Sequence, residues 1–122
     1  MNIITKKKIL CFDLDNVICK TFRNYYRQSK PIKKNINFIN KLYDNGYYIK
    51  IFTARFMGRN NDNVKNAKKM GLILTKEQLS RWKVKYHKLM FGKPSFDIYI
   101  DDKSLFFKKE WTINLKKKLN VK

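Results

Sequence analysis

The chain has 122 residues, of which 43% are hydrophobic and 15% aromatic, with four glycines and two prolines. This composition is typical of one globular domain and excludes low-complexity and collagen-like chains. No run approaches the roughly 20 apolar residues of a membrane span, and the lysines at positions 6–8 argue against a signal peptide. We therefore expect one soluble, cytoplasmic domain over residues 1–122.

The net charge is +20, from 29 basic and nine acidic residues. A basic surface favours partners that carry phosphate groups, including nucleic acid. However, only five of the basic residues are arginine, the residue on which nucleic-acid recognition relies most. The excess of Lys, Asn, Ile and Tyr is also what an AT-rich gene would encode. We therefore interpret the charge mainly as a compositional bias, with nucleic acid as an alternative partner.

Apolar runs, helical periodicity and turn residues divide the chain into alternating elements. They predict strands at residues 8–12, 47–53, 86–91 and 96–100. They predict helical segments at residues 31–45, 64–70, 75–84 and 111–119. Residues 13–30 are expected to form a loop or small hairpin.

This alternation predicts an α/β fold with a mainly parallel sheet and helices on both faces. Right-handed crossovers place the carboxyl ends of parallel strands at one edge, where ligands bind in open α/β sheets. Asp13, Thr53 and Asp101 lie at the carboxyl ends of three of the predicted strands. We therefore expect their side chains to meet at that edge.

Four of the nine acidic residues form two close pairs, Asp13 with Asp15 and Asp101 with Asp102. Paired carboxylates at strand ends suit a hard divalent cation. They can also supply a nucleophile and a general acid/base. Taken alone, each pair is also compatible with an ordinary Asp-containing turn.

Three further residues have the chemistry to bind a phosphoryl group. The Thr53 hydroxyl and the backbone amide of Ala54 can donate hydrogen bonds to its oxygens. Lys93 lies in a short loop between Gly and Pro, where its ammonium can offset negative charge. Arg55 either contacts a substrate phosphate or points into solvent.

The ordered combination of D-x-D, Thr, Lys and D-D resembles the haloacid dehalogenase superfamily of phosphohydrolases. The matching segments are F-D-L-D-N-V, I-K-I-F-T, G-K-P and I-Y-I-D-D, which together extend over nearly the whole chain. The segment G-K-P-x-x-D-x-Y-I-D-D-K is similar to small phosphatases of surface-polysaccharide and sugar-phosphate pathways. The resemblance implies a three-layer, Rossmann-like domain.

The resemblance also implies a mechanism. Asp13 attacks the phosphorus and forms an aspartyl-phosphate, and Asp15 protonates the leaving alcohol and then activates water. Mg²⁺ is expected as the cofactor, with Asp13, Asp15, Asp101 and Asp102 as the metal site. Thr53, Ala54 and Lys93 are expected to hold the phosphoryl group.

The intervals between the motifs are too short for the cap domain that many members of this superfamily insert. The site is therefore expected to be open, or covered by a neighbouring copy in a homo-oligomer. Asn16, Arg23 and Arg55 are candidate substrate contacts. We expect a small phosphorylated metabolite, such as a sugar phosphate, as the substrate. The alternatives are a nucleic-acid-end or nucleotide phosphatase, and a catalytically silent binding module.

Overall fold

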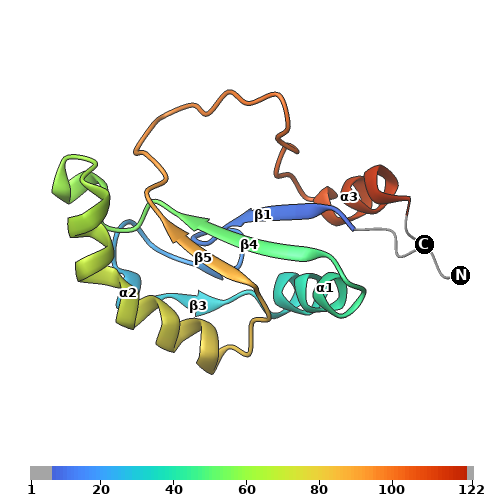
Figure 1. The fold of residues 1–122 in the computed structure, drawn as a ribbon, viewed down its shortest axis with the longest axis horizontal. Helices are drawn as coiled ribbons and strands as arrows, with labels where there is room; N and C mark the ends of the chain where they lie inside the picture. Colours follow the sequence, from blue (N-terminus) through green and yellow to red (C-terminus); the bar gives the residue numbers. More distant parts are fainter. Residues whose placement is uncertain (1–6, 121–122) are drawn as a thin grey trace, which may run out of the picture.

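The computed structural model describes residues 7–120, which form a small α/β domain (Figure 1). Its main sheet contains three strands: β1 (Ile9–Asp13), β4 (Tyr48–Thr53) and β5 (Lys88–Phe91). The short strands β2 (Cys19–Lys20) and β3 (Lys30–Pro31) form a separate hairpin. The helices are α1 (Lys33–Asp44), α2 (Val64–Arg81) and α3 (Trp111–Leu119), with 3₁₀ turns η1 (Tyr26–Gln28) and η2 (Gly58–Asn60). Within residues 7–120, no helix is both long and apolar enough to cross a lipid bilayer.

The main sheet has the order β1-β4-β5, and both strand pairs are parallel. Asp13 pairs in register with Phe52, and Thr53 pairs with Phe91. The three strands therefore end at the same edge. The predicted mainly parallel sheet is confirmed, as is the expectation that Asp13 and Thr53 lie at one edge of it.

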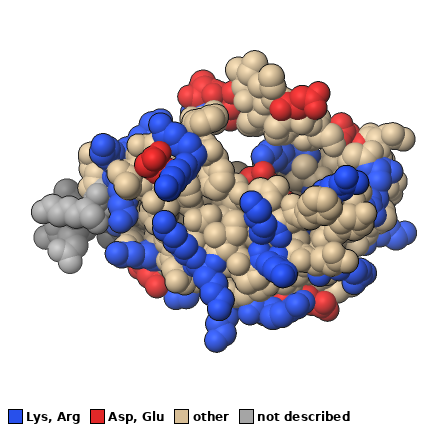
Figure 2. Space-filling model, turned by 180° about the vertical axis from the view of Figure 1, so that it is seen from behind, with Lys and Arg blue, Asp and Glu red and all other residues tan. Residues whose placement is uncertain are grey.

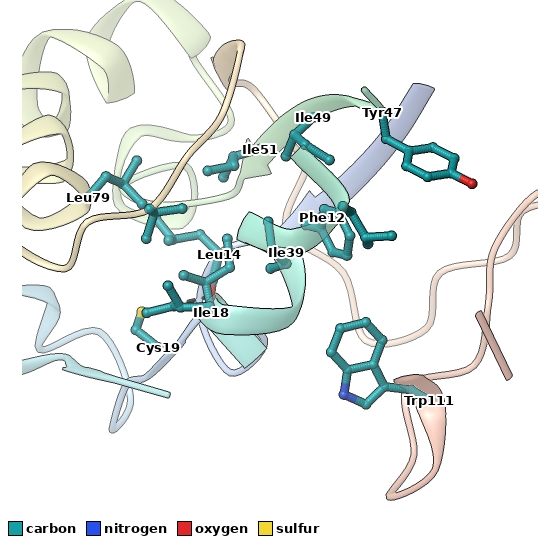
Figure 3. Packing of buried hydrophobic residues seen from close by; sticks show 13 residues of the cluster. Phe12, Leu14, Ile18, Cys19, Ile39, Tyr47, Ile49, Ile51, Leu79 and Trp111 are labelled. Carbon is teal, nitrogen blue, oxygen red and sulfur yellow. Dashed lines mark hydrogen bonds between the residues drawn. The ribbon is translucent and has the colours of Figure 1, made fainter. Parts of the chain in front are cut away.

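The helices cover one face of this sheet. Ile49 and Ile51 on β4 share a hydrophobic cluster with Ile39 of α1 and Leu79 of α2 (Figure 3). The crossovers β1-α1-β4 and β4-α2-β5 step in the same direction, so right-handed connections put both helices on that face.

α3 joins the same cluster, because the Trp111 ring packs edge-on against Phe12 of β1 and against Phe38 of α1. The opposite face of the sheet leaves Ile9, Cys11 and Tyr48 exposed. Within residues 7–120, the predicted cover of helices on both faces is therefore wrong.

α2 is longer than expected. A break after residue 70 was predicted from Gly71, yet α2 continues through this position without interruption. A Cβ atom at Gly71 would lie 2.5 Å from the ring of Phe56. The glycine therefore allows close packing of that ring against the helix, and it does not end the helix.

The largest difference from prediction lies in residues 92–110, which we call the arch. The arch leaves the end of β5 and curves away from the sheet before α3 begins (orange in Figure 1). A strand was predicted at residues 96–100, but none forms there, and Ile98 and Ile100 are 80% and 92% exposed. The apolar alternation that suggested a strand has no neighbouring strand to pair with. That strand prediction is wrong for this arrangement of the chain.

Candidate functional site

A cavity of about 350 Å³ lies at the edge of the sheet where β1, β4 and β5 end. Three of the predicted site residues line it: Asp13, Ala54 and Lys93. The rest of its wall is formed by Asn24, Tyr26, Phe56, Gly58, Arg59, Pro94, Ser95 and Phe96. We call this cavity the pocket.

Asp13 is the last residue of β1, and its carboxylate faces the pocket. Its Oδ2 lies 3.3 Å from the Nζ of Lys93, and its Oδ1 accepts a hydrogen bond from the Leu14 amide at 2.8 Å. Burial raises the pKa of Asp13 above its ordinary value, while the Lys93 ammonium acts in the opposite direction. The side chain remains 36% exposed, so one side of the carboxylate is open to a ligand.

Asp15 has different surroundings. The Nε of Arg55 donates to its two oxygens at 3.1 and 3.0 Å, and Nη2 donates to Oδ1 at 2.9 Å. The Thr21 hydroxyl also donates to Oδ1, at 2.6 Å. Asp15 does not line the pocket, so the two carboxylates of the D-x-D motif do not face the same space.

The chain turns sharply between these two carboxylates. The Ile18 amide donates to the Leu14 carbonyl at 2.9 Å, and the Asn16 amide donates to the Cys19 carbonyl at 2.6 Å. Asn16 adopts a left-handed conformation with φ of 68°, which asparagine tolerates better than most residues. Its side chain accepts a bond from the Thr21 amide and lies outside the pocket wall. The structure therefore does not place Asn16 as a substrate contact.

Arg55 is fully buried, with 0% of its surface exposed. Its Nη1 donates to Thr75 at 3.2 Å and to Gln78 at 2.5 Å, both on α2. Its Nη2 donates to Ser29 at 3.2 Å, beside β3. The guanidinium thus connects Asp15 to α2 and to the hairpin. The structure places Arg55 neither at the pocket wall, as a substrate contact would require, nor in solvent, so neither interpretation of this residue matches its position.

Thr53 is fully buried under the pocket floor. Its hydroxyl accepts a bond from the Arg55 amide at 3.1 Å, and its carbonyl accepts one from the Lys93 amide at 3.2 Å. The bond from the Lys93 amide holds the loop that carries Lys93 against the end of β4. Ala54 lines the pocket and Thr53 does not, so the structure does not bring the Thr53 hydroxyl to the pocket wall.

Asp101 and Asp102 lie on the arch and are exposed. The Lys103 amide donates to Oδ1 of Asp101 at 3.2 Å, and the Ser104 hydroxyl donates to the Asp101 carbonyl at 3.0 Å. This is the Asp-containing turn that remained open as an alternative for this pair. Acidic side chains at the top of Figure 2 lie on the arch, away from the body of the domain.

The predicted magnesium site of Asp13, Asp15, Asp101 and Asp102 is therefore not assembled. Among residues 7–120, no three His, Cys, Asp or Glu side chains come together in a way that would hold a metal ion. Both Asp15 oxygens accept hydrogen bonds from Arg55, and Asp13 is paired with Lys93. In this arrangement the residues do not fit a divalent cation.

Phe56 and Arg59, which line the pocket beside Tyr26, were not predicted as site residues from the sequence. The rings of Tyr26 and Phe56 lie 4.9 Å apart, and the Arg59 guanidinium lies 4.8 Å from the Phe56 ring. Across the pocket, the Lys93 ammonium lies 5.4 Å from the ring of Phe96. The signal for Phe56 and Arg59 is the segment F-M-G-R, which is separated by two residues from the end of the second predicted strand and lies in a stretch with the composition of an ordinary polar loop.

No protein-family model matches this sequence, and no curated protein matches it. The fold is similar to the crystal structure of an MCSG target from Vibrio cholerae, with 28% identity and a TM-score of 0.76. That match covers 91% of this chain and 98% of the other. The fold is also similar to part of the Pnkp1/Rnl/Hen1 complex, with 16% identity and a TM-score of 0.51 over 80% of this chain and 31% of that one. At that identity, the second match supports the fold alone.

Proposed function

We propose that this chain is a phosphomonoester hydrolase of the haloacid dehalogenase type, with Asp13 as the nucleophile. The observation that carries the proposal is the position of Asp13 at the end of the parallel strand β1, facing a pocket beside the Lys93 ammonium. The ordered D-x-D, Thr, Lys and D-D motifs support the same assignment. Asp13 and Lys93 line the same pocket, and this supports the proposal because phosphoryl transfer depends on positioning and on stabilisation of charge.

In the proposed reaction, an Asp13 oxygen attacks phosphorus in line as the ester P–O bond breaks. The leaving oxygen takes a proton from Asp15, and a water molecule then returns a proton to Asp15 while attacking the aspartyl-phosphate. Inorganic phosphate leaves and the Asp13 carboxylate is restored. In the described arrangement Asp15 is bound to Arg55 and does not line the pocket, so this step requires its carboxylate to turn toward the pocket. Oδ2 accepts a bond from Arg55 alone, so it is the oxygen with fewer bonds to release.

We include Mg²⁺ in the proposal as the cofactor that would stabilise charge on the phosphoryl oxygens. Binding it requires Asp101 or Asp102 to move from the arch toward Asp13. Among residues 7–120, β1 pairs with β4 on one side and with no strand on the other, so that side is available. Addition of residues 96–100 beside β1 would complete the Rossmann-like sheet expected from the sequence and bring both carboxylates near the pocket.

The pocket volume is in the range of sites that bind small metabolites. For the pocket taken alone, this volume favours a small phosphate ester such as a sugar phosphate. A catalytically silent module is the contrasting hypothesis, and it makes the opposite prediction for every phosphate ester.

The test is hydrolysis of a generic aryl phosphate by the purified protein with Mg²⁺, beside Asp13→Asn and the matched control Asp44→Asn. Asp44 is an exposed carboxylate that pairs with Lys85 at 2.7 Å, distant in sequence from the pocket residues. We expect turnover by the parent and the control and none by Asp13→Asn. Absence of turnover across a broad panel of phosphate esters would leave the silent module as the better description.

A further inference from the structure

The five arginines are distributed differently from the 24 lysines. Lysines occur on all three helices and on the arch, and basic side chains spread over the face seen in Figure 2. By contrast, Arg55 is buried, Arg59 lines the pocket, Arg27 lines a hollow that adjoins it, and Arg23 is next in sequence to Asn24, which lines both. A compositional bias toward lysine accounts for the first pattern and leaves the second unexplained. We call Arg23, Arg27 and Arg59 the arginine rim.

A second hollow, of about 460 Å³, extends the pocket along this rim. Both hollows are lined by Asn24, Tyr26, Phe56 and Arg59, so they adjoin one another. The second hollow adds Arg27 to its wall, and Arg23 immediately precedes the shared Asn24. A ligand longer than a single sugar therefore has a continuous surface from Asp13 toward Arg27.

The charges of the arginine rim are available to a ligand. Among residues 7–120 the ion pairs are Arg55 with Asp15, Lys85 with Asp44, and Lys93 with Asp13. The three rim arginines are exposed, and none of them pairs with a carboxylate of the described chain. An arginine side chain presents a planar fork of donors that matches the oxygens of a phosphate group.

Exposed aromatic rings accompany these charges. Phe22 and Tyr25 are 71% and 50% exposed, and their rings stack at 6.2 Å with 19° between the planes. The Arg23 guanidinium lies 5.2 Å from the Phe22 ring. Solvent-exposed rings beside a basic groove are the arrangement on which unpaired bases stack in proteins that bind single-stranded nucleic acid.

We propose that the arginine rim binds the backbone of a single-stranded nucleic acid whose terminal phosphate enters the pocket at Asp13 and Lys93. This inference rests on the proposed phosphatase function and names its substrate class. A small metabolite with one phosphate would occupy Lys93 and leave Arg23 and Arg27 without a ligand. A duplex would keep its bases stacked on each other and would not use the Phe22 and Tyr25 rings.

The test uses fluorescent oligothymidylates with a 3′-phosphate, a 5′-phosphate or no phosphate, in deoxy and ribo forms, measured by fluorescence anisotropy at several salt concentrations. The rim variant replaces Arg23, Arg27 and Arg59 by Gln. The control variant replaces the exposed Lys33, Lys34 and Lys41 of α1 by Gln, which removes the same charge. Thermal unfolding of both variants checks that each is folded.

We expect the rim variant to bind the phosphorylated single strands more than 10-fold more weakly than the parent, with little change for the control. Three lost phosphate contacts should reduce the slope of log K against log salt by about 2. The ratio of kcat/KM for the phosphorylated oligonucleotide to that for an aryl phosphate should fall in the rim variant. Comparison of the deoxy and ribo oligonucleotides identifies whether DNA or RNA binds more tightly.

Equal weakening of binding in the rim and control variants would overturn the inference, as would tighter binding of a duplex than of the single strand. The two proposals fail in distinguishable ways. Hydrolysis of the aryl phosphate with no loss of oligonucleotide binding in the rim variant would reject the arginine rim alone. Rim-dependent binding with no hydrolysis of any ester would reject the phosphatase function alone.

Discussion

Asp13 and Asp15 are two residues apart, but the protein holds them in opposite ways. Asp15 is fixed by a guanidinium that has no exposed surface, and that guanidinium also binds two residues of α2. Asp13 faces the pocket and has one charged partner, Lys93, within ion-pair distance. The comparison indicates that one carboxylate is braced by the fold while the other is left available to react.

The largest predicted effect is the loss of activity on replacing Asp13, the carboxylate that is available to react. Replacing Asp13 by Asn removes the proposed nucleophile, and we expect kcat to fall roughly 10⁴-fold or more. Steady-state hydrolysis of an aryl phosphate measures this loss. Residual activity within about tenfold of the parent would show that the reaction does not proceed through Asp13.

The braced carboxylate predicts a large effect on stability. Replacing Arg55 by Ala leaves Asp15 without its buried partner and removes the hydrogen bonds to Thr75 and Gln78 of α2. We therefore expect the free energy of unfolding to fall by about 3 kcal/mol. Arg55→Lys keeps the charge but lacks the planar guanidinium that reaches Asp15, Thr75 and Gln78 together, so it should recover only part of that loss. Urea denaturation measures both variants. A loss below about 1 kcal/mol for Arg55→Ala would mean that the network does not brace Asp15.

The pairing of Asp13 with Lys93 predicts how the pH dependence of kcat/KM changes when Lys93 is replaced. Asp13 must be ionised to attack, and its pKa is raised by burial and lowered by the Lys93 ammonium. Lys93→Gln removes the lowering influence, so the acidic limb of the kcat/KM profile should move to higher pH. Lys88→Gln on β5 serves as the control, since Lys88 does not line the pocket. An acidic limb that stays in place, or moves to lower pH, would contradict this account of Lys93.

The smallest predicted effect concerns the cost of keeping Asp13 ionised in the fold. Its raised pKa means that the ionised carboxylate is less favourable in the folded protein than in the unfolded chain. Asp13→Asn should therefore stabilise the protein slightly at pH 7, by less than about 1 kcal/mol because the group is partly exposed and screened. The gain should disappear as the pH falls and Asp13 becomes protonated in both states. Thermal denaturation at pH 7 and near pH 3 would detect it, and a gain that grew at low pH would have the wrong sign.

The sequence predicted the parts of this molecule that depend on local pattern. The apolar runs before Asp13 and Thr53 and the helical periodicity ending at Asn45 all correspond to observed elements. Parallel pairing then follows from the alternation of strands and helices, which is why the position of Asp13 at the sheet edge was foreseeable.

The parts that sequence did not predict depend on partners far along the chain. Arg55 follows a strand in a T-A-R segment that looks like an exposed loop. Its burial depends on Thr75 and Gln78, which lie 20 and 23 positions further along the chain. Residues 96–100 have the alternation of a strand, but a strand also needs a neighbour, and nothing in that local pattern specifies whether β1 provides it. The same missing pairing separates Asp101 from Asp13.

The central claim, that Asp13 carries the phosphoryl group during the reaction, can be tested by mass spectrometry of the protein acid-quenched during turnover of an aryl phosphate with Mg²⁺. The account predicts that the peptide containing Asp13 gains the mass of one phosphoryl group, and that the gain is absent in Asp13→Asn. Turnover without phosphorylation of that peptide, or phosphorylation of a different residue, would contradict it.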